Sequence, residues 1–289
     1  MKTDIRKPEW LKKSWKITEE TIEVESLIAD LGLNTVCREA SCPNYYECFG
    51  RGTATFMILG SACTRSCGFC GVTHEIPEKP DPEEPSRVGA AVKKLELSYV
   101  VITSVTRDDL GDGGADHFAK TVREIRRQSP ETKIETLIPD FGGSASALAL
   151  VIDAEPDVIS HNMETVRALY GKVRPQADYD RSLELIRRVA SSGKAIQNDT
   201  VISKSGFMVG VGETDEQVLE LMDDLRKSGC SFLTIGQYLR PAPENIPVEE
   251  YITPEKFDYW AEKAREKGFA FVASAPFVRS SYHAEEALP

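Results

Sequence analysis

The chain has 289 residues, of which 41% are hydrophobic, and its 35 basic against 46 acidic residues give a formal net charge of −11. This length and composition predict a folded, soluble protein whose core belongs to one large barrel or two ordinary domains. The acidic balance disfavours a nucleic-acid-binding protein, and no segment approaches the roughly eighteen apolar residues of a membrane span.

The N-terminal part of the chain carries the first of two cysteine groups. Its first eight residues lack the apolar core of a secretion signal, so we expect a cytoplasmic protein, or one of an organelle matrix if a transit peptide was trimmed. Cys37, Cys42 and Cys48 then follow in a C-x4-C-x5-C spacing. We expect residues 1–50 to form an N-terminal extension that carries these thiols, in a compartment that keeps them reduced.

The second cysteine group follows a short apolar run, residues 54–59, that predicts a strand. Cys63, Cys67 and Cys70 have a C-x3-C-x2-C spacing. A two-cluster ferredoxin would show C-x2-C-x2-C-x3-C-P, and a zinc ribbon would show two C-x2-C pairs, so neither matches. A structural zinc site is disfavoured because zinc of that kind normally takes four protein ligands. Three thiolates leave one iron of an iron–sulfur cluster open for another ligand.

Apolar runs alternate with amphipathic stretches through the rest of the chain. The predicted strands cover residues 54–59, 99–105, 133–138, 158–161, 206–211 and 232–239. The predicted helices cover residues 86–96, 116–128, 179–191 and 215–228, with Ser86 and Thr214 as candidate N-caps. This alternation predicts an α/β fold with a parallel, barrel-like sheet over residues 51–268, and functional groups at the carboxyl ends of its strands.

Some residues allow more than one interpretation. Asp108, Asp109 and Asp112 either contact a cofactor or fix turns, since Asp and Gly together form turns. Cys230 lies far from both cysteine groups, and we expect it to be a small buried residue.

Several motifs resemble those of one known enzyme family. The C-x3-C-x2-C loop, with Phe69 before its last cysteine, resembles the cluster loop of the radical S-adenosylmethionine (SAM) superfamily. The C-x4-C-x5-C group narrows the resemblance to the lipoate-forming branch of that superfamily. The other matching segments, which extend the resemblance over essentially the whole chain, are Arg6–Leu11, Thr103–Leu110, Asp112–Gly114, His161–Val166, Val173–Pro175, Lys204–Gly206, Gly212–Thr214, Gln237–Pro241 and Val278–His283.

The resemblance implies a partial (β/α)6 TIM-like barrel with N- and C-terminal extensions, the latter at residues 269–289, both packed near the barrel mouth. It also implies two [4Fe–4S] clusters. Cys63, Cys67 and Cys70 would hold the first, with SAM on its open iron. Cys37, Cys42 and Cys48 would hold the second, which is auxiliary and sacrificial, with Ser281 as its fourth, catalytically important ligand. Asn162, Glu164, Arg174 and Lys204 are the expected SAM contacts.

The activity that the resemblance implies is a sulfurtransferase reaction. Two sulfur atoms from the auxiliary cluster enter at C6 and C8 of a protein-bound octanoyl-lysine, which forms the lipoyl cofactor. The implied partners are an octanoylated carrier domain, a low-potential electron donor and an iron–sulfur cluster assembly or repair protein. The carrier is either a 2-oxo acid dehydrogenase subunit or the glycine-cleavage carrier protein. We expect neither a nucleic acid nor a membrane as a partner.

Three other classes of protein remain open. Another two-cluster radical enzyme, such as a methylthiotransferase, would share the C-x3-C-x2-C loop. A non-enzymatic electron carrier would need no substrate cavity. A zinc-structured binding protein would be colourless and indifferent to oxygen.

Overall fold

The computed structural model describes residues 6–13, 16–51, 54–193, 195–196 and 199–288. The first five residues and the last one, which belong to the two expected extensions, lie outside this description. Within these ranges, no helix combines the length and the apolar composition that a membrane crossing requires.

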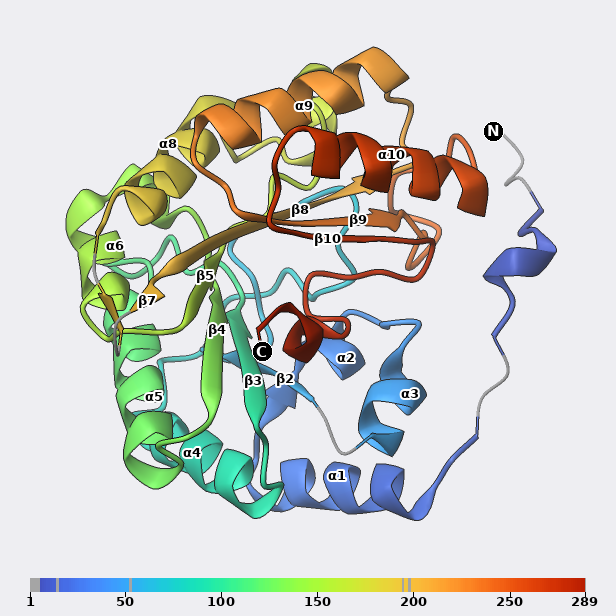
Figure 1. Ribbon diagram of the computed structural model, residues 1–289. Helices are drawn as coiled ribbons and strands as arrows, with labels where there is room; N and C mark the ends of the chain where they lie inside the picture. Colours follow the sequence, from blue (N-terminus) through green and yellow to red (C-terminus); the bar gives the residue numbers. More distant parts are fainter. Residues whose placement is uncertain (1–5, 14–15, 52–53, 194, 197–198, 289) are drawn as a thin grey trace.

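A curved sheet of eight strands forms the centre of the fold, in the order β1-β2-β3-β4-β5-β8-β9-β10. The strands are β1 (Asn34–Thr35), β2 (Thr55–Ile58), β3 (Tyr99–Ser104), β4 (Lys133–Leu137), β5 (Val158–Ser160), β8 (Ile202–Val209), β9 (Phe232–Gln237) and β10 (Phe271–Ser274). Only β1 runs antiparallel to its neighbour in this sheet. The sheet is curved but not closed, and helices lie along its outer, convex side (Figure 1). A separate hairpin pairs β6 (Ala195–Ile196) with β7 (Asp199–Thr200).

The six predicted strands are confirmed as β2, β3, β4, β5, β8 and β9. The prediction for β8 was wrong at its start, because the strand already begins at Ile202. Residues 202–204 pair with β5, and Lys204 also pairs with Phe232 of β9. The pattern missed β1, which has two residues, and β10, which has four.

The helices are α1 (Glu19–Asp30), α2 (Val36–Glu39), α3 (Tyr45–Gly50), α4 (Glu84–Lys94), α5 (Ala115–Gln128), α6 (Ala145–Ile152), α7 (Tyr170–Val173), α8 (Tyr179–Ala190), α9 (Asp215–Lys227) and α10 (Pro254–Glu266). Four of them, α4, α5, α8 and α9, confirm the predicted helices. Thr214 caps α9 as predicted, since its side chain accepts a hydrogen bond from the backbone N–H of Gln217. The N-cap prediction for Ser86 was wrong. Helix α4 starts at Glu84, with Pro85 in its first turn, where proline costs no helical hydrogen bond.

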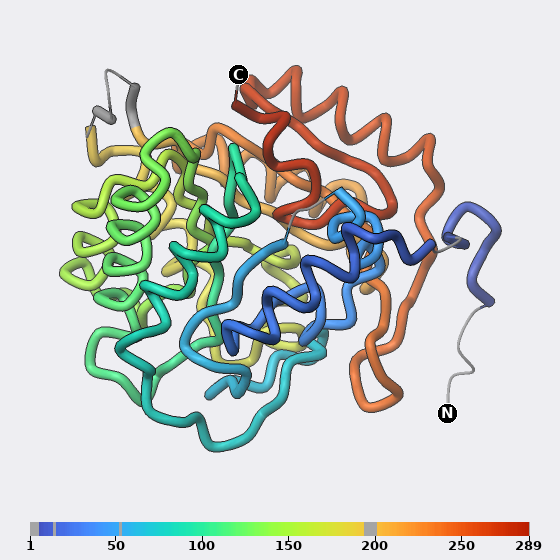
Figure 2. The backbone as a smooth tube through the Cα atoms, turned by 90° about the horizontal axis from the view of Figure 1, so that it is seen from below, coloured from blue at the N-terminus to red at the C-terminus, as the bar shows by residue number. Residues whose placement is uncertain are grey.

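The two chain ends meet at the open side of the barrel. The N-terminal part contributes α1, β1, α2 and α3, and of these α2 and α3 lie beside the C-terminal tail in both views (Figures 1 and 2). The side-chain amide of Asn44 donates a hydrogen bond to the carbonyl of Phe277 at 2.7 Å, and the Tyr282 hydroxyl donates to Glu47 at 2.7 Å. Strand β1 also pairs with β2, so the N-terminal extension is joined to the barrel sheet. The division into residues 1–50, 51–268 and 269–289 stays a prediction.

Candidate cluster and cofactor site

A cavity of about 830 Å³ lies at the carboxyl ends of the barrel strands, and both cysteine groups line it. All six of these cysteines are free thiols rather than disulfides. Within the described residues, no three histidine, cysteine or acidic side chains are gathered closely enough to hold a single metal ion. The thiols instead line a wide cavity.

The second cysteine group lies on a loop directly after β2. The Cys63 sulfur accepts hydrogen bonds from the backbone N–H groups of Arg65 and Thr106, at 3.4 and 3.3 Å. The side-chain amide of Asn245 donates to the carbonyl of Cys70 at 2.9 Å. A Cβ atom at Gly68 would come within 2.9 Å of the Ile246 side chain, so the loop passes close to the segment after β9. These contacts fix the position of the Cys63 sulfur and of the loop that carries it.

Arg65, between the first two cysteines of this loop, anchors it to two strand ends. Its guanidinium donates two hydrogen bonds to Asp108, at 2.7 and 2.8 Å, and two to Asp140, at 2.7 and 3.0 Å. Burial alone would raise the pKa of Asp140, but the Arg65 guanidinium holds it well below its usual range. Sequence reasoning missed Arg65, although an arginine inside a thiol loop was a visible signal. Its partners lie 43 and 75 residues away in the sequence.

The structure gives local roles to the three aspartates whose interpretation was open. Asp108 pairs with Arg65, and Asp109 pairs with Arg107 at 2.8 Å. Asp112 accepts hydrogen bonds from the backbone N–H groups of Gly114 and Asp116, at 2.9 and 2.8 Å, and thereby fixes the turn before α5. These contacts favour the turn and loop roles.

The first cysteine group is carried by two short helices and the turn between them. Cys37 lies in α2 and Cys48 in α3, while the backbone N–H of Cys42 donates to the carbonyl of Cys37 at 3.1 Å. Burial raises the pKa of the Cys37 and Cys48 thiols to about 12. Three thiolates in this buried environment would need a compensating positive charge, which iron provides when bound. This donor set therefore fits an iron–sulfur cluster.

Ser281 lines the same cavity as Cys37, Cys42 and Cys48. The tail that carries it is tied to α3, because Glu47 accepts the hydrogen bond from Tyr282 and pairs with Lys13 at 2.5 Å. The Lys13 ammonium lies 5.4 Å from the centre of the Tyr282 ring. The structure thus brings Ser281 together with the three cysteines, as the resemblance implied, while its role as a ligand stays a prediction.

Three of the four expected SAM contacts line the cavity: Asn162, Glu164 and Arg174. Asn162 donates to Glu164 at 3.0 Å, and Arg174 donates to the carbonyl of Asn162 at 2.8 Å. Burial raises the pKa of Glu164 despite the nearby Arg174. Among the described residues, the buried side-chain oxygen of Asn162 and the Nε of Arg174 have no hydrogen-bond partner. Unpartnered buried polar atoms are what a site for a polar ligand shows when only the protein is present.

The structure does not place Lys204 with the other three expected SAM contacts. Lys204 does not line the cavity; its ammonium pairs with Glu135 of β4 at 2.8 Å. The Lys204 and Glu135 side chains are 1% and 0% exposed. Lys204 therefore belongs to a buried ion pair between two strands. Cys230 is fully buried in a hydrophobic cluster, as predicted.

The burial of His161, in the wall of the cavity, makes the stability of the folded protein depend on pH. Its Nδ1 lies 2.8 Å from the carbonyl of Ile138 and its Nε2 lies 3.0 Å from the Ser182 hydroxyl, so Nδ1–H donates and Nε2 accepts. Burial, with the nearby Arg174, lowers the pKa of His161 to about 4, whereas an unfolded histidine has about 6.5. The neutral ring therefore contributes stability that is lost as pH falls from about 6.5 to about 4. We expect His161 to account for a loss of about 2 kcal/mol in the free energy of unfolding between pH 7 and pH 5.

Urea unfolding of the cluster-free protein at both pH values, compared with His161→Gln, measures this contribution. The variant should show a correspondingly smaller change between the two values. Equal changes in both proteins would contradict the prediction.

Comparison with known proteins gives consistent matches. The family model described as the radical SAM superfamily matches residues 57–225. A curated relative from Alkaliphilus metalliredigens, described as lipoyl synthase, is 52% identical over 283 residues, which cover 98% of this chain and 96% of that protein. One from Symbiobacterium thermophilum with the same description is 53% identical over 281 residues, covering 97% and 86%.

Solved structures are similar in fold. SuiB from Streptococcus suis, bound to SAM, matches with a TM-score of 0.59 and 14% identity over 93% of this chain and 62% of that chain. The hydrogenase maturase HydG from Carboxydothermus hydrogenoformans matches with a TM-score of 0.57 and 12% identity over 80% of this chain and 63% of that chain. The expected α/β fold of the radical SAM type, an open barrel with mainly parallel strands, is confirmed.

Proposed function

The chain belongs to the lipoyl synthases of the radical SAM superfamily, and from this membership we propose that its large cavity brings together two [4Fe–4S] clusters, SAM and the octanoyl chain of a carrier domain. The protein is an enzyme that uses SAM and iron–sulfur clusters to insert sulfur. The observation that carries the proposal is that both cysteine groups and Ser281 line one cavity.

Each cysteine group has its own task in this proposal. Cys63, Cys67 and Cys70 hold one cluster, and the first group, together with Ser281, holds the other. When bound, the cluster on Cys63, Cys67 and Cys70 would supply the electron that splits SAM into methionine and a 5′-deoxyadenosyl radical, and the auxiliary cluster would supply two sulfur atoms. Ser281 provides a harder ligand than a thiolate. Its alkoxide would leave the iron when protonated, which would suit a cluster that is opened during the reaction.

Asn162, Glu164 and Arg174 orient SAM beside the cluster loop. The buried Glu164 carboxylate accepts hydrogen bonds from the ammonium or hydroxyl groups of SAM, whose positive charge stabilises its ionised form. The unpartnered oxygen of Asn162 accepts another. Arg174 keeps both in place through the carbonyl of Asn162, and its guanidinium also donates to the Tyr170 hydroxyl at 2.9 Å.

Apolar side chains hold the substrate chain and exclude water. Leu137, Ile138, Phe207, Met208 and Val278 all line the cavity. Burying an acyl chain against them contributes about 0.8 kcal/mol for each methylene group. A dry wall also protects a carbon radical from side reactions. From the family membership, the proposed substrate is an octanoyl-lysine on a carrier domain, which presents its acyl chain to the mouth of this cavity. An electron donor of low potential and a protein that restores the clusters complete the proposed set of partners.

The test uses anaerobically reconstituted enzyme, an octanoyl-lysyl peptide, SAM and a strong reductant. Mass spectrometry should find a peptide that has gained two sulfur atoms, together with 5′-deoxyadenosine. Deoxyadenosine with an unchanged peptide would mean that the acyl substrate is wrong. No deoxyadenosine from enzyme with verified clusters would contradict the radical mechanism.

A further inference from the structure

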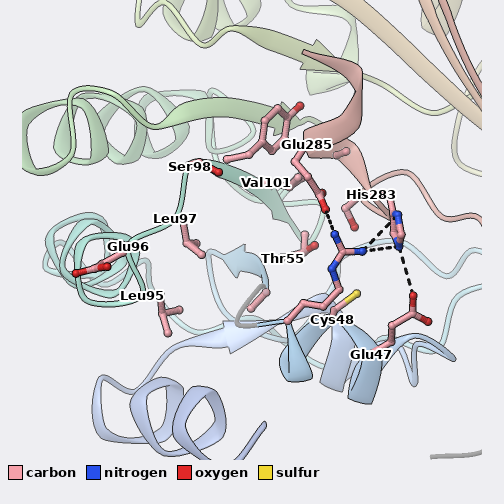
Figure 3. A pocket seen from close by; sticks show the side chains of 15 residues that line it. Glu47, Cys48, Thr55, Leu95, Glu96, Leu97, Ser98, Val101, His283 and Glu285 are labelled. Atoms are coloured by element: carbon pink, nitrogen blue, oxygen red, sulfur yellow. Dashed lines mark hydrogen bonds and ion pairs between the residues drawn. The ribbon is translucent and has the colours of Figure 1, made fainter. Parts of the chain in front are cut away.

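A second cavity, of about 310 Å³, reaches the first cysteine group from another direction. Its walls come from α3, the start of β2, the turn between α4 and β3, β3 itself and the C-terminal tail (Figure 3). It shares only Cys48, Thr55 and Ser281 with the large cavity, among the described lining residues. These three side chains therefore stand between the two cavities.

The rim of the second cavity is polar and charged, whereas its inner wall is apolar. Glu96 and Ser98, in the turn after α4, are exposed, and Arg51 and Glu285 form a half-exposed ion pair at 2.8 Å. Leu97 and Val101, deeper in the wall, are 8% and 5% exposed. Leu97 and Ser98 lie across the cavity from Cys48 (Figure 3). The cavity thus leads from a charged rim at the surface to the sulfur of Cys48.

The rim provides both signs of charge. Glu96 supplies an exposed carboxylate, Glu47 and Glu285 supply carboxylates that pair with Lys13 and Arg51, and the Arg51 guanidinium also contacts His283 at 2.8 Å. Carboxylates attract a small divalent cation, and a guanidinium attracts a small anion. None of the three cysteines of the second group lines this cavity.

We propose that this second cavity is a separate opening to the auxiliary cluster, through which ferrous and sulfide ions leave and return. The inference rests on the proposed assignment of Cys48 and Ser281 as ligands of that cluster. A reaction that uses up the cluster requires it to be rebuilt after each round. A carrier domain that covers the mouth of the large cavity would leave this second opening free.

The test isolates the auxiliary cluster in a protein that carries Cys63→Ala, Cys67→Ala and Cys70→Ala. In this background, Ser98→Trp fills the rim of the second cavity, and Ala54→Leu fills its wall. Ser86→Trp is the matched control, because Ser86 is an exposed serine on α4 and lines neither cavity. After anaerobic reconstitution, a water-soluble ferrous chelator is added with dithionite, which keeps the released iron ferrous. The rate of iron release is then read from the colour of the chelate.

We expect both filling variants to release iron several-fold more slowly than the background, and to reload more slowly with ferrous iron and sulfide, while Ser86→Trp behaves like the background. Ser98 is exposed, so its replacement tests the opening even if Ala54→Leu fails to fold. Equal release rates in all four proteins would overturn the opening alone. A background protein that binds no iron would overturn the ligand assignment, and the opening with it.

Discussion

Cys42→Ala is expected to abolish sulfur insertion while 5′-deoxyadenosine still forms, whereas Cys67→Ala is expected to abolish both. The reason is that the two cysteine groups hold different clusters in the proposed mechanism. Cys42 belongs to the group on α2 and α3, and Cys67 lies in the loop after β2 that Arg65 anchors. Removing one thiolate from a three-thiolate set removes a cluster ligand that no neighbouring cysteine replaces.

The measurement is the ratio of deoxyadenosine to two-sulfur peptide, quantified by mass spectrometry in one reaction. Cys230→Ala is the matched control, because this thiol is fully buried and donates to the carbonyl of Phe232 at 3.2 Å, away from the cavity. It should keep both products and lose only about 1 kcal/mol of stability. Sulfur insertion by Cys42→Ala, or its failure to form deoxyadenosine, would show that the two groups do not have separate tasks.

Lys204→Met is expected to lower the free energy of unfolding by about 3–5 kcal/mol, because it leaves a buried carboxylate without its counter-charge. Glu135 is 0% exposed and accepts hydrogen bonds from Lys204 and from the Tyr99 hydroxyl, at 2.8 and 2.7 Å. Tyr99 cannot replace the ammonium, since burial and the adjacent carboxylate raise its own pKa.

Urea denaturation of the single variant and of Lys204→Met with Glu135→Gln distinguishes this structural role from contact with SAM. The double variant should regain most of the lost stability, because no buried charge remains. It should also form deoxyadenosine at the wild-type KM for SAM. A stable single variant with a raised KM for SAM would instead restore the original expectation for Lys204.

The same residue shows where sequence reasoning failed. Apolar runs were sufficient to predict six strands, but the first half of β8 contains Ser203, Lys204 and Ser205, and polar residues conceal a buried strand. All three are buried, and Lys204 and Ser203 have partners on other segments: Glu135 for Lys204 and the carbonyl of Gly229 for Ser203. A side chain whose partner lies far along the chain has no local signal.

The candidate site likewise contains residues that the local sequence predicts and residues that it does not. The cysteines were predictable because their spacing within each group reflects local loop geometry. Arg65 depends on strand ends that only the folded barrel brings together. Ser281 is more than two hundred residues from the first cysteine group, so resemblance alone could indicate it. Ser86 is not the N-cap because Pro85, directly before it, favours the first turn of a helix, so α4 begins earlier, at Glu84.

The contacts between the two chain ends have a consequence for synthesis. Both cysteine groups leave the ribosome long before the tail that contacts Asn44 and Glu47. Until then, α3 lacks the contacts that Phe277 and Tyr282 provide. A chain that has not yet emerged as far as Tyr282 therefore lacks Ser281 and both of these contacts, so the proposed auxiliary site is completed late in synthesis.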